Sequence, residues 1–257
     1  MTSSPVRPEE TKRRGRFSEL LKVQGKLALR EPNGVLGIGI PFALLVVFAL
    51  IGSYEPGNTC NTSYTVLDLY IPIVMVIGFL FIGLGLPSTL VRDREIGWLR
   101  RVSTTPVHPS RLLAAQLVIN LIFALITVVV VIFGGDVIFG AALDVNVLFF
   151  VLSIVLSIGV IFSLGLVLVA VAPSQAAANA LGGVTVFGLM FLSGLWTPPE
   201  LVGGPLATII YYSPSGAAVS ALLDSAFNQV PPYTTLVTLV VYTVVFAFIA
   251  IRYFRWE

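Results

Sequence analysis

All fifteen Lys and Arg residues of the chain fall in three short blocks, which long stretches without a basic side chain separate. The blocks cover residues 7–30, 92–111 and 252–255. A basic residue at the centre of a membrane helix costs roughly 2.5–3.5 kcal/mol, and short cytoplasmic loops carry an excess of Lys and Arg. The blocks therefore predict which parts of the chain stay on the cytoplasmic side of a bilayer.

The composition predicts an integral membrane protein. Hydrophobic residues make up 56% of the chain and charged residues only 11%, whereas a soluble domain carries about 25% charged residues. The net charge of +2 does not indicate nucleic-acid binding, because the basic residues gather on one side of the membrane. Cys60 is the one cysteine, so it is either unpaired or bridged to another chain. The first thirty residues lack the apolar core of a signal peptide.

A membrane span needs about 20 mainly apolar residues, and the sequence predicts six spans with both termini in the cytoplasm. An odd number of spans would place Arg252 and Arg255 outside. With six spans, the loops that lack basic residues and contain acidic ones lie on the outer side. The predicted spans are residues 34–52, 67–90, 112–134, 146–171, 176–196 and 234–252.

The segment before the first span, within residues 1–33, is predicted to contain an amphipathic helix that lies in the cytoplasmic interface. Lys22, Lys26 and Arg30 recur at four-residue intervals on one face, and apolar residues occupy the other face. Such a helix turns its basic side toward anionic headgroups. A solvated helix of a small cytoplasmic domain is the alternative. Residues 34–257 are predicted to form a single transmembrane domain.

Residues 197–231 are predicted to form an outer re-entrant hairpin between the fifth and sixth spans. Proline and glycine interrupt two apolar runs, 206–212 and 216–223, each too short to cross a bilayer. Non-helical backbone at membrane depth is tolerated where protein or water satisfies its polar groups.

The residues for catalysis are missing, so no enzyme and no cofactor of its own are predicted. His108 is the sole histidine, and the chain contains no glycine-rich phosphate loop. No Asp, Glu, Lys, Arg or His lies in the middle third of any predicted span, whereas ion-coupled transporters place such groups within the membrane. Energy for any transport is therefore expected from elsewhere.

The loop between the second and third predicted spans combines an acid–glycine–basic helix with a Thr-Pro stop. The pattern Arg94-Glu95-x-Gly97-x-Leu99-Arg100-Arg101, followed by Thr105-Pro106-Val107, resembles the cytoplasmic loop of type-2 ABC exporter permeases. Arg30-Glu31-Pro32 is similar to the segment that enters the first span in the drug-exporter branch, as in daunorubicin-resistance permeases. Ser193-Gly194-Leu195-Trp196-x-Pro198, followed by Ser213-Pro214, resembles the outer end of the fifth span and the hairpin of that family. Trp98 departs from the family, which often has a small polar residue there.

The resemblance implies a half-transporter that pairs with a second permease subunit, identical or homologous, above two separate ABC ATP-binding subunits. ATP and Mg would be bound by those partner subunits. The loop helix from Asp93 to Val102 would dock into the ATPase, with Glu95 oriented by a pair with Arg100 or Arg101. The residues implied in coupling are Asp93, Arg94, Glu95, Gly97, Trp98, Leu99, Arg100, Arg101, Thr105 and Pro106.

The same resemblance implies that the second and fifth spans face each other across the dimer. The residues implied in the substrate pathway are Phe79, Asn179, Phe187, Met190 and Phe191; ordinary lipid-facing or core residues are the alternative for each. The predicted function is ATP-driven export of hydrophobic or amphiphilic small molecules, such as drugs and antibiotics, across the bacterial cytoplasmic membrane. Export of lipid or polysaccharide, an ion-coupled transporter and a membrane scaffold without transport activity are the alternatives.

Overall fold

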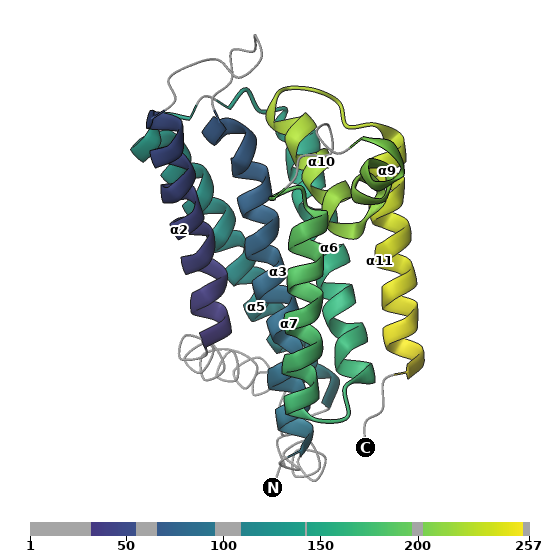
Figure 1. Cartoon of the computed structure of the whole chain (residues 1–257). Coiled ribbons are helices and arrows are strands. Elements are labelled where there is room, and N and C mark those ends of the chain that lie inside the picture. Colours follow the sequence, from purple (N-terminus) through teal and green to yellow (C-terminus); the bar gives the residue numbers. More distant parts are fainter. Residues whose placement is uncertain (1–31, 55–65, 96–108, 142, 197–202, 254–257) are drawn as a thin grey trace, which may run out of the picture.

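The described part of the chain is an all-helical bundle. The computed structural model describes residues 32–54, 66–95, 109–141, 143–196 and 203–253, and these residues form no strand beyond one isolated bridge between Asp144 and Phe227. The long helices extend between the same two ends of the bundle (Figure 1). They are α2 (Pro32–Tyr54), α3 (Val66–Glu95), α5 (Pro109–Phe133), α6 (Val147–Val171), α7 (Gln175–Leu192) and α11 (Tyr233–Tyr253).

Consecutive long helices alternate in direction, which separates the charges along the bundle (Figure 1). The ends of α3 and α11 and the start of α5 lie at the same end of the bundle and carry Arg92, Arg94, Arg252 and Arg111; we call this the basic end. The opposite end, the acidic end, has carboxylates and, among the described residues, no Lys or Arg. Its carboxylates are those of Asp68, Asp136, Asp144 and Asp224.

The prediction of a polytopic membrane protein is confirmed by the length and composition of these helices. Five helices are long and apolar enough to cross a bilayer, and a sixth span is reached if the bent pair described below counts as one. The described apolar part of α2, Leu36–Ile51, is shorter than these five. The five candidate spans are Leu67–Arg92, Ala114–Ile138, Val147–Val171, Gln175–Leu192 and Tyr233–Tyr253.

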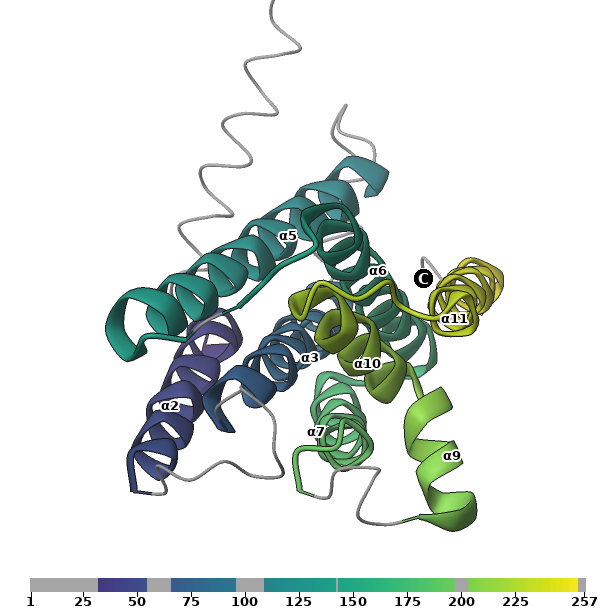
Figure 2. The same cartoon turned by 90° about the horizontal axis from the view of Figure 1, so that it is seen from above.

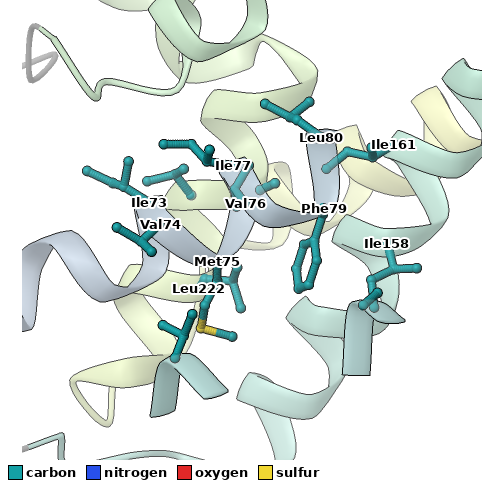
Figure 3. Packing of buried hydrophobic residues seen from close by; sticks show 14 of the residues in the cluster. Ile73, Val74, Met75, Val76, Ile77, Phe79, Leu80, Ile158, Ile161 and Leu222 are labelled. Carbon is teal, nitrogen blue, oxygen red and sulfur yellow. The ribbon is translucent and has the colours of Figure 1, made fainter. Parts of the chain in front are cut away.

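Helix α3 forms the centre of the bundle. It packs against α2, α5, α6 and α7, and Figure 2 shows these helices arranged around it. Within the subunit, 72% of the apolar stretch of α3 is buried, against 17% of that of α11. Figure 3 shows part of the core, in which side chains from Ile73 to Leu80 of α3 gather with Ile158 and Ile161 of α6 and Leu222.

Two glycines let α3 and α6 touch backbone to backbone. A Cβ atom on Gly165 of α6 would overlap the carbonyl oxygen of Gly83 on α3. A Cβ atom on Gly83 would lie 2.7 Å from Cγ2 of Ile161. Small residues at such positions allow the close helix packing that is typical of membrane proteins.

Two short helices, α9 (Gly204–Tyr212) and α10 (Pro214–Ala226), meet at an angle of 80° at the acidic end (Figure 1). Pro205 and Pro214 stand in the first turns of these helices, where the missing N–H costs no hydrogen bond. Tyr211 of α9 and Thr235 of α11 share a hydrogen bond of 2.8 Å between their hydroxyl groups. The two apolar runs, residues 206–212 and 216–223, lie within these two helices, and the outer re-entrant hairpin stays a prediction.

Three helix boundaries differ from the sequence-based prediction. Asp93 to Glu95, assigned to a separate loop helix, are the last turn of α3, because nothing interrupts the helix after Leu90. α7 ends at Leu192 rather than at Trp196, because Gly194 has a φ of 80° and so leaves the helical region. The third span continues beyond Phe133 as a π-helix, η2 (Gly134–Ile138).

Candidate functional site

A groove of about 180 Å³ lies between α2, α3 and α7, in the half of the bundle nearer the basic end. Leu36 of α2 forms one wall, and small and apolar residues of α3 and α7 form the others. Its lining from α3 is Phe81, Leu84, Gly85 and Ser88, and its lining from α7 is Asn179, Gly182, Gly183, Val186 and Phe187.

The chemistry of the groove is apolar with two neutral polar groups. Ser88 donates a hydrogen bond from its hydroxyl to the carbonyl oxygen of Gly85 at 2.8 Å, so that hydroxyl is partly occupied by its own helix. Asn179 is exposed, and its side-chain amide has no hydrogen-bond partner among the described residues. No charged side chain lines the groove. The surface therefore suits an uncharged apolar group that carries a hydrogen-bonding atom.

The predicted pathway residues separate into three groups in the structure. Asn179 and Phe187 line the groove, and 72% of Phe187 is exposed. Phe191 is exposed on α7 but does not line it. Phe79 is fully buried and Met190 nearly so, both within the core of the subunit. Because Phe79 is fully buried in this conformation, a cargo molecule cannot contact it. The pathway role of all five residues stays a prediction.

Sequence reasoning missed most of the groove, although one signal was available. Gly182 and Gly183 are adjacent on α7, and Gly85 lies in α3. Clusters of glycine in membrane helices mark close contacts between helices. A Cβ atom on Gly182 would lie 3.1 Å from the carbonyl oxygen of Leu84, whereas one on Gly183 would meet nothing within 4 Å. Gly182 thus lets α7 approach α3, and Gly183 leaves the groove open.

α7 has a largely exposed outward face in the subunit. It is the least apolar of the five candidate spans, and 28% of its apolar stretch is buried, against 17% for α11. Val184 and Phe187 are more than 70% exposed. Gly188, like Gly183, has open space at its Cβ position. Small residues on a helix face allow close contacts between membrane helices.

The basic end of α7 is joined to α3 by a side chain. Oε1 of Glu95 accepts a hydrogen bond from the backbone N–H of Gln175 at 3.0 Å. Ser174 is the N-cap of α7, and its hydroxyl oxygen accepts a hydrogen bond from the N–H of Ala177 at 3.1 Å. Both acceptors satisfy N–H groups that the first turn of a helix cannot satisfy internally.

The acidic end of α7 is joined to the junction between α9 and α10. The hydroxyl of Ser215 donates a hydrogen bond to the carbonyl oxygen of Leu189 at 2.8 Å. The hydroxyl oxygen of Ser213 lies 3.3 Å from the carbonyl oxygen of Leu192. Gly216 packs so closely that a Cβ atom there would overlap the carbonyl oxygen of Ile210 and lie 2.9 Å from that of Leu192. All three residues of this junction, Ser213, Ser215 and Gly216, are buried.

Most of the predicted coupling residues lie outside the described part of the chain. Residues 97–106 and the interfacial residues Lys22, Lys26 and Arg30 fall in undescribed segments. Asp93, Arg94 and Glu95 form the end of α3 at the basic end. The structure therefore leaves the interfacial helix and the coupling loop as predictions.

Comparison with known proteins connects this arrangement to one family. The family model described as ABC-2 type transporter matches residues 16–227, most of the chain. The match includes α2, α3, α7 and the two short helices of the hairpin. No curated protein sequence matches the chain significantly.

Proposed function

Because the chain belongs to the ABC-2 type transporter family, and so is the membrane permease component of an ABC transporter, we propose that it exports hydrophobic or amphiphilic small molecules. Drugs and antibiotics are the proposed cargo. Permease domains of this family generally work with an ATP-binding subunit and a second permease. The proposed complex therefore contains two permease subunits, identical or homologous, and two ATP-binding subunits that bind ATP and Mg.

The proposed topology has six spans, with α2 as the first and the α9–α10 pair as an outer re-entrant hairpin. The charge separation along the bundle supports it, since Arg92, Arg111 and Arg252 stand on helix ends that lie at the same end of the bundle. Short cytoplasmic loops carry the excess of basic residues. The basic end is accordingly the cytoplasmic end, both termini are cytoplasmic, and the membrane is the bacterial cytoplasmic membrane.

The groove between α2, α3 and α7 is the observation that carries the choice of cargo. Sites for drug-sized ligands have volumes of roughly 300–1,000 Å³, and the groove of one subunit, about 180 Å³, is too small for one. Two copies that face each other through α7 would double the volume and reach this range. The exposed, small-residue face of α7 is suited to that pairing. Each subunit thus supplies half of the proposed cargo site.

The lining of the groove supports an uncharged or amphiphilic cargo. A charged group buried there would find no oppositely charged partner among the residues that line the groove, and unpaired charge is costly to bury. Asn179 offers an amide that can donate and accept hydrogen bonds. It is the proposed polar contact, with Phe187 as an apolar one.

Transport in proteoliposomes tests the proposal. The permease is reconstituted with its ABC ATP-binding subunit, and ATP-dependent movement of an uncharged fluorescent amphiphile is measured. Transport should require the ATP-binding subunit and its hydrolysis of ATP. Transport by the permease alone, driven by a proton gradient, would show that the proposed function is wrong.

Filling the groove tests the cargo site. Gly183→Leu places a side chain in the open space of the groove, and we expect transport to fall about tenfold, the effect of losing roughly 1.4 kcal/mol of binding. Gly39→Leu is the matched control, because Gly39 of α2 also has open space at its Cβ position but does not line the groove. Equal transport by the two variants would show that the groove is not part of the transport pathway.

A further inference from the structure

The contact between Glu95 and Gln175 joins the last residue of α3 to the first residue of α7, across 80 positions of sequence. The carboxylate lies where the partial positive charge of the helix dipole is strongest, so it is attracted to the start of α7. A hydrogen bond from a backbone N–H to an ionised carboxylate is stronger than one between neutral groups. The side chain therefore links two elements of the groove at their cytoplasmic-side ends.

This link is additional to ordinary helix capping. Ser174 already accepts a hydrogen bond from Ala177 within the first turn of α7. Glu95 binds a different N–H, that of Gln175, from another helix. Its removal would leave the serine cap in place. The particular contribution of Glu95 is to fix where α7 begins relative to where α3 ends.

Glu95 directly precedes the segment that is proposed to contact the ATP-binding subunit. Residues 96–108 follow it directly and include the proposed contact with the ATP-binding subunit. α3 is an unbroken helix up to Glu95. A displacement of that segment is therefore passed directly to the two described residues that flank it, Glu95 of α3 and Pro109 of α5.

On the other side of the link, α7 leads straight to the groove. Asn179 is one helical turn after Gln175, and α7 supplies half of the groove lining. A shift of the first turn of α7 would therefore change the width of the groove next to Asn179.

We propose that Glu95 is a positioning residue that transmits movement of the segment after α3 to the first turn of α7, and so to the cargo groove. This inference rests on the proposed function, because the movement is that caused by ATP binding to the partner subunits. The carboxylate binds no cargo and no nucleotide. The carboxylate holds the start of α7 through the N–H of Gln175, so the first turn of α7 moves with the end of α3.

The first test compares coupling in Glu95→Ala, Glu95→Gln and Ser174→Ala, each in the full complex in proteoliposomes. The measured quantity is the number of cargo molecules moved per ATP hydrolysed. We expect Glu95→Ala to keep ATP hydrolysis and to lower this ratio about tenfold, within the range of typical coupling effects. Glu95→Gln keeps an acceptor oxygen for Gln175 and should retain more of the ratio. Ser174→Ala, which weakens the same helix end without touching α3, should leave the ratio unchanged.

The second test measures hydrogen–deuterium exchange of the amides at residues 175–178, with and without a non-hydrolysable ATP analogue. In the wild-type complex the analogue should change exchange in this turn, and in Glu95→Ala that change should disappear. An unaltered coupling ratio in Glu95→Ala, or a nucleotide-dependent change that persists in it, would overturn the role of Glu95. A wild-type complex that hydrolyses ATP and moves no amphiphile would instead contradict the proposed function, and the exchange measurement would still decide the role of Glu95.

Discussion

The two ends of α7 are attached to the rest of the subunit in opposite ways. At the acidic end, buried hydroxyl groups of Ser213 and Ser215 reach the last carbonyl groups of the helix, and Gly216 packs against them without space for a methyl group. At the basic end, the polar attachment is one exposed carboxylate, that of Glu95, and Ala178 packs in a small buried cluster with Leu90 and Val91 of α3. A buried hydrogen bond is costly to break because its groups lose their partners, whereas water replaces an exposed one. The hydrogen bonds that hold α7 are thus buried at one end and exposed at the other.

The largest effect is expected where the acidic end is most tightly packed. Gly216→Ala would place a Cβ atom on the carbonyl oxygen of Ile210, and neither backbone can move aside without disturbing α7 or α9. We expect the variant to lose about 3 kcal/mol or more, at the upper end for overpacking. The midpoint of thermal unfolding of the purified protein measures this.

Gly188→Ala is the matched control for that variant. Gly188 lies within α7 and has open space at its Cβ position. Replacing glycine by alanine inside a helix stabilises by up to about 1 kcal/mol, so this variant should unfold at the same temperature as the wild type or higher. Equal destabilisation of the two variants would show that the junction is not specially packed.

A smaller effect is expected from Ser215→Ala. The substitution removes the buried hydrogen bond to the carbonyl oxygen of Leu189, which should cost about 1 kcal/mol. Faster amide exchange near Leu192, measured by mass spectrometry, should accompany it. Ser220→Ala, on the same helix but with no hydrogen bond from its hydroxyl among the described residues, should change neither quantity.

The smallest effect on stability is expected at the basic end. Ser174→Ala removes an N-cap, a change that costs as little as about 0.5 kcal/mol, and Ser174 is only half-buried. Exchange should become faster in the first turn of α7 and stay unchanged near Leu192. If Ser174→Ala destabilised the protein as much as Gly216→Ala, the contrast between the two ends would be lost.

Long apolar runs let the sequence place the helices well, but not the directions in which their side chains point. Phe79 and Phe187 stand in similarly apolar surroundings, yet one is fully buried and the other largely exposed. Every residue of α3 from Ile71 to Pro87 is apolar, so no periodic pattern distinguishes the face toward α6 from the face toward a partner. Asn179 could be identified because it interrupts such a run.

The link at Glu95 could not be predicted from sequence for a different reason. The acid–glycine–basic pattern drew attention to Glu95 and suggested Arg100 or Arg101 as its partner. Its observed partner among the described residues is a backbone N–H on a helix 80 positions later. A backbone N–H has no identity in a sequence, because every residue except proline carries one. Only the packing of α7 against α3 reveals that Gln175 is in reach.

The backbone contact between Gly83 and Gly165 supplies a fixed reference for following any movement of α7. With no side chains between them at this point, α3 and α6 cannot slide or tilt against each other without collision. α6 in turn packs against α10 and α11, which extends the same rigid unit. Spectroscopic distance labels on α6 and α11 should therefore report a constant separation through the transport cycle, and a label on α7 measured from either should report the motion alone.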